Sequence, residues 1–467
     1  MTAADEPART SKWRVLASVV FGVFMVTLDT TAVNVAFPVI RSEFGASLHE
    51  AQWLVSVYVL ALGMSTPVAG FLADRFGLKR MYIVGLAIFV VGSLTAGLAP
   101  SLPTLVLARA LKGIGGGIAV PCGTALLFRG FSKSELGLAL GVFGLALLFA
   151  PALGPVLGGW LVDHQLWRWI FFINVPIGTL GILVASRFLV TRPGDVHARW
   201  DGWGLVTAIP GFGALLYVTA LLGEEGWRSP RLLAWLAVGM ASLGAFVYVE
   251  LRVASSPLLD LRLFRRPVFL IATLVGYVTV IAFFGAEFLL PVYLQSIRGE
   301  PALTVGLVLL PLALCAGLLL PLAGVVYDRI GPRVLVVGGF ALLCYNTWQL
   351  AHIGPSTSLR FLVMITAIRG FALGLTVQTP FTAALADVEH DALPRATSLV
   401  SSTRYLVQAY GIAALATLLG TRLVGGGQVT LEGFHRAYML TFWLSVVGMM
   451  LGVLLPGWPG RVDRVDT

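Results

Sequence analysis

The chain has 467 residues, of which 57% are hydrophobic and only 12% are charged, and its mean hydropathy is +0.88. A soluble globular protein carries about 25% charged residues, so this composition excludes an ordinary water-soluble domain. The net charge of +9 would suit a nucleic-acid-binding protein, but in a membrane chain basic cytoplasmic loops are the commoner cause. We therefore expect an integral membrane protein with the lipid bilayer, and no nucleic acid, as its partner.

The apolar residues form long blocks separated by Gly, Pro or charge clusters. Crossing the hydrocarbon layer takes about 20 apolar residues. The blocks predict fourteen transmembrane helices, at residues 14–40, 48–72, 80–100, 103–128, 134–160, 167–189, 202–223, 231–253, 267–296, 302–326, 333–352, 359–384, 396–422 and 434–457. The first block is too long for a cleavable signal peptide. The fold class is therefore expected to be all-α and membrane-integral.

Loop charges predict the orientation of these helices. An even number of spans puts both termini on one side, and the segments on that side hold 20 Lys and Arg residues against 8 on the other. Positive charge favours the cytoplasmic side, so both termini are expected in the cytoplasm of a multi-pass cell-membrane protein. The remaining basic residues lie inside spans: Arg109, Lys112, Arg369 and Arg404.

One short pattern occurs twice. G-x-x-x-D-R-x-G stands at Gly70–Gly77 after the second span and at Gly324–Gly331 after the tenth, 254 residues apart. The fourth span contains Arg109-x-x-x-Gly113, and the twelfth span contains the related pattern Arg369-Gly370-x-x-x-Gly374. The two patterns follow each other in the same order in both parts of the chain, which indicates two homologous halves. Transporters built in this way bind substrate near the midplane, where the halves meet. The expected parts are a six-helix bundle at 1–190, two inserted helices at 191–260 and a second six-helix bundle at 261–467.

Four segments carry a resemblance to a known family. Gly70–Arg80 resembles the loop signature of the major facilitator superfamily. Leu28–Pro38 resembles the first-span signature of its fourteen-helix drug:proton antiporters, the EmrB/QacA type. Ala150–Gly159 resembles their fifth-span antiporter signature, and Trp167–Gly178 is typical of the same branch. The matches run in order over nearly the whole chain.

The resemblance implies the major facilitator fold, with two pseudo-symmetric bundles and two inserted helices. It also implies a proton-coupled antiporter that exports amphipathic, drug- or antibiotic-like small molecules by alternating access, without a cofactor. Its partners would be the small-molecule substrate and protons, and some relatives also work with an accessory adaptor protein. In this superfamily the first and fourth helices of each half line the cavity, here the first, fourth, ninth and twelfth spans.

Asp29 lies near the middle of the first span. A carboxylate there costs about 2.5–3.5 kcal/mol on insertion scales, so it should face a watery cavity or a cationic partner. Burial raises the pKa of carboxyl groups in general, which lets them exchange protons near neutral pH. Proton coupling is the favoured role for Asp29, and a structural hydrogen bond is the alternative. Glu287, in the ninth span, is a second candidate by the same argument.

Arg109 and Lys112 are three residues apart on the fourth span and share a face. The family pattern there is Arg-x-x-Gln-Gly, so Lys112 stands in place of a glutamine. Arg109 is expected to tune the protonation of Asp29, and Lys112 to touch the substrate. The alternative is an ion pair of Lys112 with Asp29 or Glu287 that only neutralises the site. A free Lys112 would favour an anionic, zwitterionic or neutral substrate over a purely cationic one.

Further polar residues in the spans are candidates for the pocket or for structure. Arg404, in the thirteenth span, falls outside the expected cavity and is interpreted as a structural partner. The predicted substrate-binding residues are Lys112, Asn34, Tyr58, Gln378 and Arg369.

Two groups of residues are predicted to control the conformational change. Small residues at i, i+4 spacing in the fifth span favour close helix packing, and the resemblance adds a pivot that suppresses uniport leak. Asp74 and Asp328 are expected to make charge-assisted bonds to helix ends that latch the outward-facing state. The predicted gating residues are Gly70, Asp74, Arg75, Gly77, Asp328, Arg329, Pro151, Gly154, Pro155 and Gly158.

Other chemistry lacks a sequence signal. No G-x-x-x-x-G-K-S/T pattern occurs, which disfavours an ATP-driven pump. The three cysteines have no metal-ligand spacing, so no metal site is expected. The apolar blocks leave no room for a soluble catalytic domain, so no enzyme is expected. The competing functions are export of a specific anionic or zwitterionic metabolite, import of a polar metabolite, and a transporter-like receptor or lipid flippase.

Overall fold

The computed structural model describes residues 10–46, 48–131, 135–191, 201–225, 228–254, 257–285, 289–389, 391–418 and 430–457, and among them it contains helices and loops without strands. The first elements are α1 (Thr10–Glu43), α2 (Leu48–Phe76), α3 (Leu78–Gly97), α4 (Leu102–Gly130), α5 (Leu136–Asp163), α6 (Trp169–Phe172), α7 (Asn174–Phe188), α8 (Gly202–Glu225), α9 (Pro230–Tyr248) and the π-helical η1 (Val249–Val253). The others are the 3-10 helix η2 (Leu261–Arg265), α10 (Pro267–Val280), the π-helical η3 (Ile281–Gly285), α11 (Leu289–Val292), the π-helical η4 (Tyr293–Ile297), α12 (Ala302–Ile330), α13 (Pro332–Leu350), α14 (Leu359–Thr376), α15 (Thr379–Leu385), α16 (Leu393–Leu418) and α17 (Leu431–Val453).

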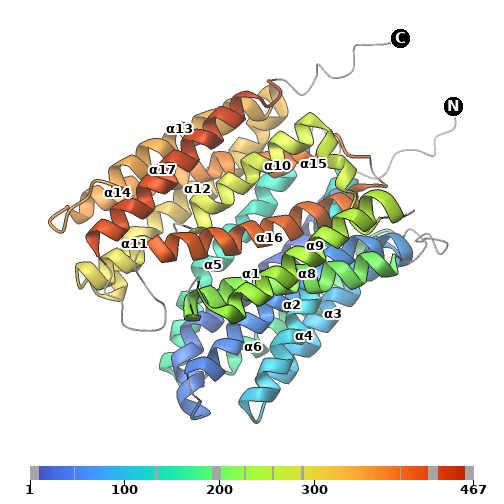
Figure 1. Cartoon of the computed structure of the whole chain (residues 1–467), viewed down its shortest axis with the longest axis horizontal. Helices are drawn as coiled ribbons and strands as arrows, with labels where there is room; N and C mark the ends of the chain where they lie inside the picture. Colours follow the sequence, from blue (N-terminus) through green and yellow to red (C-terminus); the bar gives the residue numbers. More distant parts are fainter. Residues whose placement is uncertain are drawn as a thin grey trace.

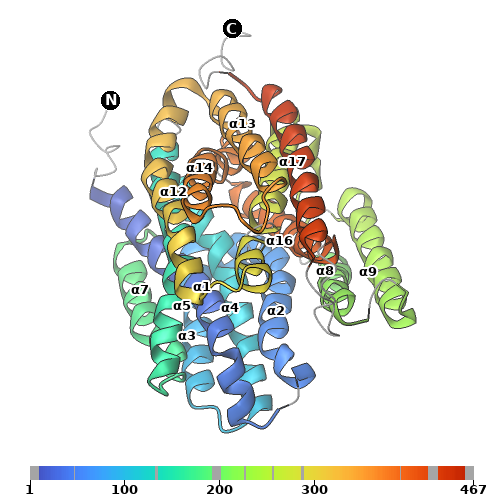
Figure 2. The same ribbon diagram turned by 90° about the vertical axis from the view of Figure 1, so that its left-hand side faces the viewer.

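These helices form two halves. Figure 1 shows α1–α7 gathered on one side of the molecule and α10–α17 on the other, with α8 and α9 alongside. Within the first half α4 packs on α2 and α3, and within the second α14 packs on α12 and α13. Helix α1 begins and α17 ends at the same end of the bundle, which we call the termini end (Figure 2). Each of the fourteen predicted segments overlaps a helix or a run of helices among the described residues.

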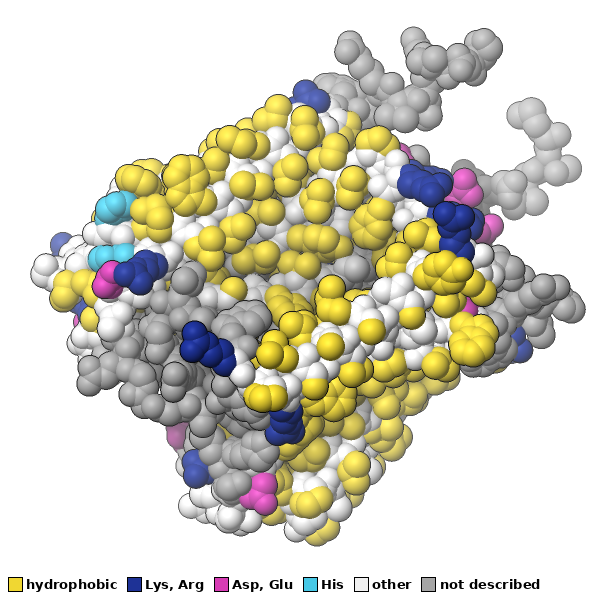
Figure 3. All heavy atoms as spheres, viewed as in Figure 1, with side chains coloured by type: hydrophobic (Ala, Val, Ile, Leu, Met, Phe, Trp, Pro, Cys, Tyr) yellow, Lys and Arg dark blue, Asp and Glu magenta, His cyan; other side chains and the backbone are white. Residues whose placement is uncertain are grey.

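The surface of the helices suits lipid. Ten helices among the described residues are long and apolar enough to cross a membrane. Large apolar side chains point outward, with Leu107 70% and Leu318 73% exposed. Figure 3 shows hydrophobic side chains over much of the visible face. An apolar surface of this extent is stable in a bilayer and unfavourable in water. The all-helical membrane fold predicted from composition is confirmed.

Helix α8 touches both halves. Its Tyr217 ring stacks on Trp53 of α2, with ring centroids 5.9 Å apart. From the second half, the Tyr410 hydroxyl of α16 donates a hydrogen bond to the Leu215 carbonyl oxygen at 3.1 Å. Helix α9 packs chiefly on α8 and on η1, which continues it. The inserted pair therefore lies over the seam between α2 and α16.

Besides the span expected over 167–189, which is divided into α6 and α7 at Ile173, two predicted helices are interrupted, which corrects the sequence analysis. The helix expected over 267–296 consists of α10, η3, α11 and η4, and residues 286–288 lie outside the described part. The helix expected over 359–384 ends at Thr376 and resumes as α15 at Thr379. Pro380 explains the second break, because its ring lacks an N–H and clashes with the preceding turn.

The repeated motif forms the same turn in each half. Gly77 has φ 91° and Gly331 has φ 79°, so both adopt a left-handed conformation that favours glycine. The Gly77 amide donates to the Ala73 carbonyl oxygen at 2.8 Å, and the Gly331 amide donates to that of Tyr327 at 2.9 Å. Each turn ends one helix and starts the next within a single residue. A positive φ and the same amide hydrogen bond at equal motif positions support the relation between the halves.

Gly331→Ala is expected to destabilise the protein. With φ 79° and ψ −179°, Gly331 occupies a region where a Cβ costs about 1–3 kcal/mol. Gly338→Ala is the matched control, since Gly338 lies on the adjoining α13 with nothing near its Cβ position. Thermal unfolding of the detergent-purified variants should show a lower Tm for Gly331→Ala alone. Equal melting temperatures would contradict the strained turn.

Candidate functional site

A buried charge cluster surrounds Asp29 of α1, which is 1% exposed. Its Oδ2 accepts a hydrogen bond from Arg109 Nη1 at 2.5 Å, and its Oδ1 accepts one from Lys112 Nζ at 2.5 Å. Asn174 Nδ2 of α7 also donates to Oδ1 at 3.1 Å. One carboxylate thus joins α1, α4 and α7.

Arg109 is held on three sides. Its Nε donates to the Leu54 carbonyl oxygen at 2.9 Å, and its guanidinium carbon lies 4.1 Å from the centre of the Tyr58 ring. The Tyr58 hydroxyl in turn donates to the Val26 carbonyl oxygen at 3.2 Å. Tyr58 is therefore part of the Asp29 cluster, where it supports Arg109 by a cation–π contact.

Lys112 points into the interior of the first half. Its Nζ lies 4.8 Å from the Phe89 ring centre on α3 and 4.9 Å from the Phe171 ring centre on α6. The side chain is fully enclosed, and Gly92 of α3 leaves room for it because a Cβ there would meet the lysine stem. The structure thus contains the Asp29–Lys112 ion pair that the sequence left open as an alternative. A substrate contact of Lys112 stays a prediction.

The glycines of α4 allow the helices around these charged side chains to pack closely. A side chain at Gly113 would overlap the Tyr58 backbone on α2, and one at Gly115 would overlap the backbone of Gly85 and Phe89 on α3. Close approach of this kind is what small residues permit in membrane helices. These glycines hold α4 tightly between α2 and α3, and Gly116 does the same toward α1, where a Cβ would meet Val26.

The fifth-span signature packs beside the same cluster. A Cβ at Gly154 would overlap Thr31 of α1, and one at Gly158 would meet the Ala32 carbonyl oxygen. A small cavity next to Asp29 is lined by residues of α1 and α5 and by Ile170, Ile173 and Asn174, with room for about one water molecule. The side chains of Pro151 and Pro155 lie outside the described part. Any shift of α5 is therefore transmitted directly to the turn of α1 that follows Asp29.

Arg369 of α14 has no carboxylate partner among the described residues. Its Nη2 donates to the carbonyl oxygens of Ala282 at 2.9 Å and Phe283 at 3.4 Å. Phe283 follows Asp29 by 254 residues, the same offset as the repeated loop motif. Among the described residues of the second half, Arg369 thus binds backbone carbonyl oxygens of η3 where Arg109 binds a carboxylate. Glu287 and the side chain of Asn34 are not among the described residues.

Gln378 lies between the halves. It occupies the break between α14 and α15, is 6% exposed, and packs against Gly144 of α5. Its Nε2 has no hydrogen-bond partner among the described residues. Arg404 lies on α16, outside the Asp29 cluster.

The repeated motifs join the two halves at the termini end. Asp74 Oδ2 accepts a hydrogen bond from Arg395 Nε of α16 at 2.5 Å. Asp328 Oδ1 accepts one from the Gly137 amide at 3.0 Å and Oδ2 one from the Leu138 amide at 3.4 Å, at the start of α5. A carboxylate at a helix N-terminus is stabilised by the unpaired amides and the helix dipole.

The first glycine of each repeated motif lies at the same contact between the halves as the aspartate of that motif. A Cβ at Gly70 would meet the Pro394 carbonyl oxygen, and one at Gly324 would overlap the Gly137 backbone. Of the neighbouring arginines, Arg75 lies over the Phe76 ring and Arg329 is exposed.

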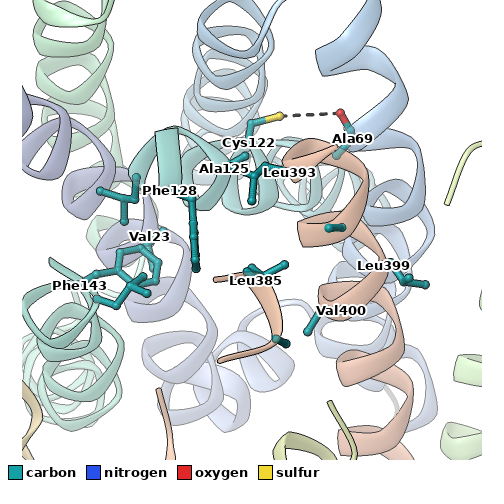
Figure 4. Close-up of a cluster of buried hydrophobic side chains, with 14 of the residues drawn as sticks. Val23, Ala69, Cys122, Ala125, Phe128, Phe143, Leu385, Leu393, Leu399 and Val400 are labelled. Atoms are coloured by element: carbon teal, nitrogen blue, oxygen red, sulfur yellow. Dashed lines mark hydrogen bonds between the residues drawn. The ribbon is translucent and has the colours of Figure 1, made fainter. Parts of the chain in front are cut away.

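Apolar side chains close the space between the halves near this end. Figure 4 shows Phe128 of the first half between Phe143 of the same half and Leu385 of the second, with Leu393 nearby. These residues belong to one buried cluster that spans both halves. Toward the opposite end, two other clusters of described residues each stay within one half. The halves are therefore joined at the termini end.

Asn174 is a cluster residue that the sequence analysis did not assign to the site. The sequence could have indicated it, because Asn174 is the one polar residue in the apolar run from Trp169 to Ile177. Its Oδ1 is buried and accepts no hydrogen bond from a described residue. The amide group thus uses its donor side to hold Asp29.

Comparison with known proteins identifies the relatives of this chain. The family model described as Major Facilitator Superfamily matches residues 19–412. The uncharacterized MFS-type transporter YhcA of Bacillus subtilis is 32% identical over 86% of this chain and 75% of its own length. The lincomycin resistance protein LmrB of Listeria monocytogenes is 28% identical, covering 94% of this chain and 96% of LmrB. The multidrug export protein EmrB of Haemophilus influenzae is 31% identical over 93% of each chain.

Among solved structures, the human organic anion transporter MFSD10 is similar in fold. The match has a TM-score of 0.66 and 16% sequence identity, and covers 94% of this chain and 100% of that one.

Proposed function

The chain belongs to the major facilitator superfamily, and on that premise we propose that it exports an amphipathic small molecule in exchange for protons. It is a multi-pass membrane transporter and not an enzyme. The names of LmrB and EmrB denote lincomycin resistance and multidrug export. Their similarity over more than nine-tenths of this chain supports a drug- or antibiotic-like substrate. We place the protein in the cell membrane with fourteen spans and both termini in the cytoplasm.

The Asp29 cluster is the observation that carries this proposal. Ionisable residues inside a membrane are expensive and are found where ions or protons act. A purely structural role would be served as well or better by apolar side chains. Here three charged groups are enclosed together, and the α5 glycines pack on the adjacent turn of α1. A change in the protonation of the Asp29 cluster would thus be transmitted through α1 to α5, which also packs on α12 of the second half.

The contacts at the termini end support an alternating-access cycle. With the termini in the cytoplasm, the Asp74 and Asp328 bonds and the apolar cluster of Figure 4 close the cytoplasmic side. Opening that side requires these bonds to break and the halves to rotate apart. The substrate would then bind between the halves, where Gln378 and Arg369 are available.

Asp328→Asn is expected to favour the state that is open at the termini end. Hydrogen bonds to a charged group are worth about 1.5–3 kcal/mol, and partial exposure lowers this value, so we expect a shift of roughly tenfold in the conformational equilibrium. Spin-label distances between the termini-end parts of α5 and α12 would measure it. Asp163→Asn, at the exposed other end of α5, is the control. An unchanged distance distribution in Asp328→Asn would contradict the latch.

Proteoliposomes would test the proposed function. The purified protein would be offered lincomycin, a cationic dye, a zwitterion and an anion, each with and without an imposed proton gradient. We expect uphill movement of at least one amphipathic compound that stops when the gradient is collapsed, and no requirement for ATP. Transport that ignores the gradient would indicate a facilitator. Movement of a fluorescent phospholipid alone would indicate a flippase, and either result would overturn the proposal.

A further inference from the structure

The Asp29 cluster contains one more positive than negative side chain. Arg109 and Lys112 both bind Asp29, and each of the three side chains is 1% exposed or less. Their other described contacts are neutral: the Leu54 carbonyl oxygen, the Asn174 amide, and the rings of Tyr58, Phe89 and Phe171. With all three groups ionised, the enclosed site carries an excess charge of +1. Excess charge in a low-dielectric interior is unfavourable.

Two protonation changes are available to the cluster, and they act in opposite directions. Protonating Asp29 would leave two cations facing each other without an anion, which raises the excess charge to +2. Removing a proton from Lys112 would leave the Asp29–Arg109 pair, which is neutral as a whole. Arg109 has no such option, because a guanidinium keeps its proton in proteins. The lysine amine would still have two N–H bonds, one of which can donate to Asp29 Oδ1.

From this geometry we propose that Lys112, and not Asp29, binds and releases the exchanged proton. The inference rests on the proposed function as a proton-coupled exporter. In the step itself, one Nζ–H bond breaks, the electron pair stays on nitrogen, and the proton passes to water. Rebinding reverses it. Asp29 remains ionised throughout and acts as the fixed counter-ion of Arg109.

The surroundings of Lys112 leave no other described group for this role. The charged groups that face it are Asp29 from α1 and Arg109 from its own helix. Helices α3 and α6 present Phe89, Gly92 and Phe171, and α7 presents the Asn174 amide. The enclosed arrangement therefore suits a neutral Lys112. An ammonium there favours a conformation in which water reaches the cluster, so protonation and opening are linked.

Three purified variants would test the assignment in weakly buffered detergent and in proteoliposomes. Lys112→Gln fixes the neutral state, Lys112→Arg fixes the charged state, and Lys79→Arg is a matched control. Lys79 bonds to the carbonyl oxygens of Ser186 and Leu189, away from the cluster. A pH indicator would count protons released when lincomycin, or the compound found to be transported, is added. Gradient-driven accumulation would be measured in parallel.

In the wild type and Lys79→Arg we expect proton release and uphill accumulation. In Lys112→Gln we expect no proton release and an accumulation ratio at least about tenfold lower, while downhill transport persists at a measurable rate and shows that the protein is folded. Lys112→Arg should also release no proton. Wild-type proton release from Lys112→Gln would overturn the inference and leave the proposed function standing. A wild type that moves substrate without any proton dependence would instead overturn the proposed function.

Discussion

Asp29→Asn is expected to destabilise the protein strongly and to abolish transport. The substitution removes the counter-ion of Arg109 and the charged hydrogen-bond acceptor of Lys112, and both basic side chains stay buried. Breaking a buried ion pair by removing one partner costs about 3–5 kcal/mol. We therefore expect a clear fall in the melting temperature of the detergent-purified protein. Gradient-driven transport in proteoliposomes should fall to the background of empty vesicles.

A double substitution separates lost stability from lost coupling. Asp29→Asn combined with Lys112→Gln removes the buried amine that has lost its charged acceptor, so part of the lost stability should return. Transport should stay absent, because the cluster has then lost both its acid and its titratable base. Glu432→Gln is the control, since Glu432 pairs with Arg436 on an exposed surface and such pairs contribute little. If Asp29→Asn transports normally against a gradient, Asp29 has no part in coupling.

Gly324→Val is expected to stop the transport cycle by preventing closure at the termini end. A Cβ at position 324 would lie on the backbone of Gly137, and a backbone has no rotamer with which to move away. The contact is between α12 and α5, so the strain falls on the approach of the two halves and not on either half alone. We expect transport to fall by roughly a hundredfold, since the closed state would have to rise by about 2.7 kcal/mol for that effect.

Gly306→Val is the matched control, because Gly306 is on the same α12 and has open space around its Cβ position. Spin-label distances across α5 and α12 should increase at the termini end in Gly324→Val and stay unchanged in Gly306→Val. Both variants should retain a cooperative thermal transition. Wild-type transport by Gly324→Val would mean that α5 and α12 do not approach this closely during the cycle.

The sequence predicted which basic residues lie near Asp29 better than it predicted where their side chains point. Three-residue spacing placed Arg109 and Lys112 on one helix face, and the mid-span carboxylate required a cation nearby. Spacing alone does not say which neighbours that face meets. Lys112 turns toward Phe89 and Phe171 because Gly92 opens a space on α3. That choice depends on the packing of three helices.

The repeated motif was informative for a different physical reason. A glycine after Asp-Arg can adopt a positive φ with no Cβ penalty, and both Gly77 and Gly331 do so. Local backbone chemistry decides such a turn, so a sequence pattern is enough to predict it. The contact of Asp328 with the amides of α5 also follows from a local property, the unpaired amides at a helix start.

The break after α10 had no comparable signal. Residues Ile281–Gly285 are as apolar as their neighbours, and hydropathy does not report which carbonyl each amide pairs with. The π-helical register of η3 accompanies the hydrogen bonds from Arg369 to Ala282 and Phe283. A tertiary contact of this kind, between residues 86 or 87 positions apart, lies beyond any pattern read within a single segment.

The placement of α8 makes the two seams between the halves unequal. It lies over the α2–α16 seam, through Trp53 on one side and Tyr410 on the other. At the second seam, α5 and α12 pack mainly on each other and on helices of their own halves. An amphipathic molecule dissolved in the bilayer would therefore meet α8 before the α2–α16 seam, whereas at the other seam it would meet α5 and α12 themselves. Entry of a substrate from the lipid phase would require α5 and α12 to part at the second seam, or α8 to move away as well at the first.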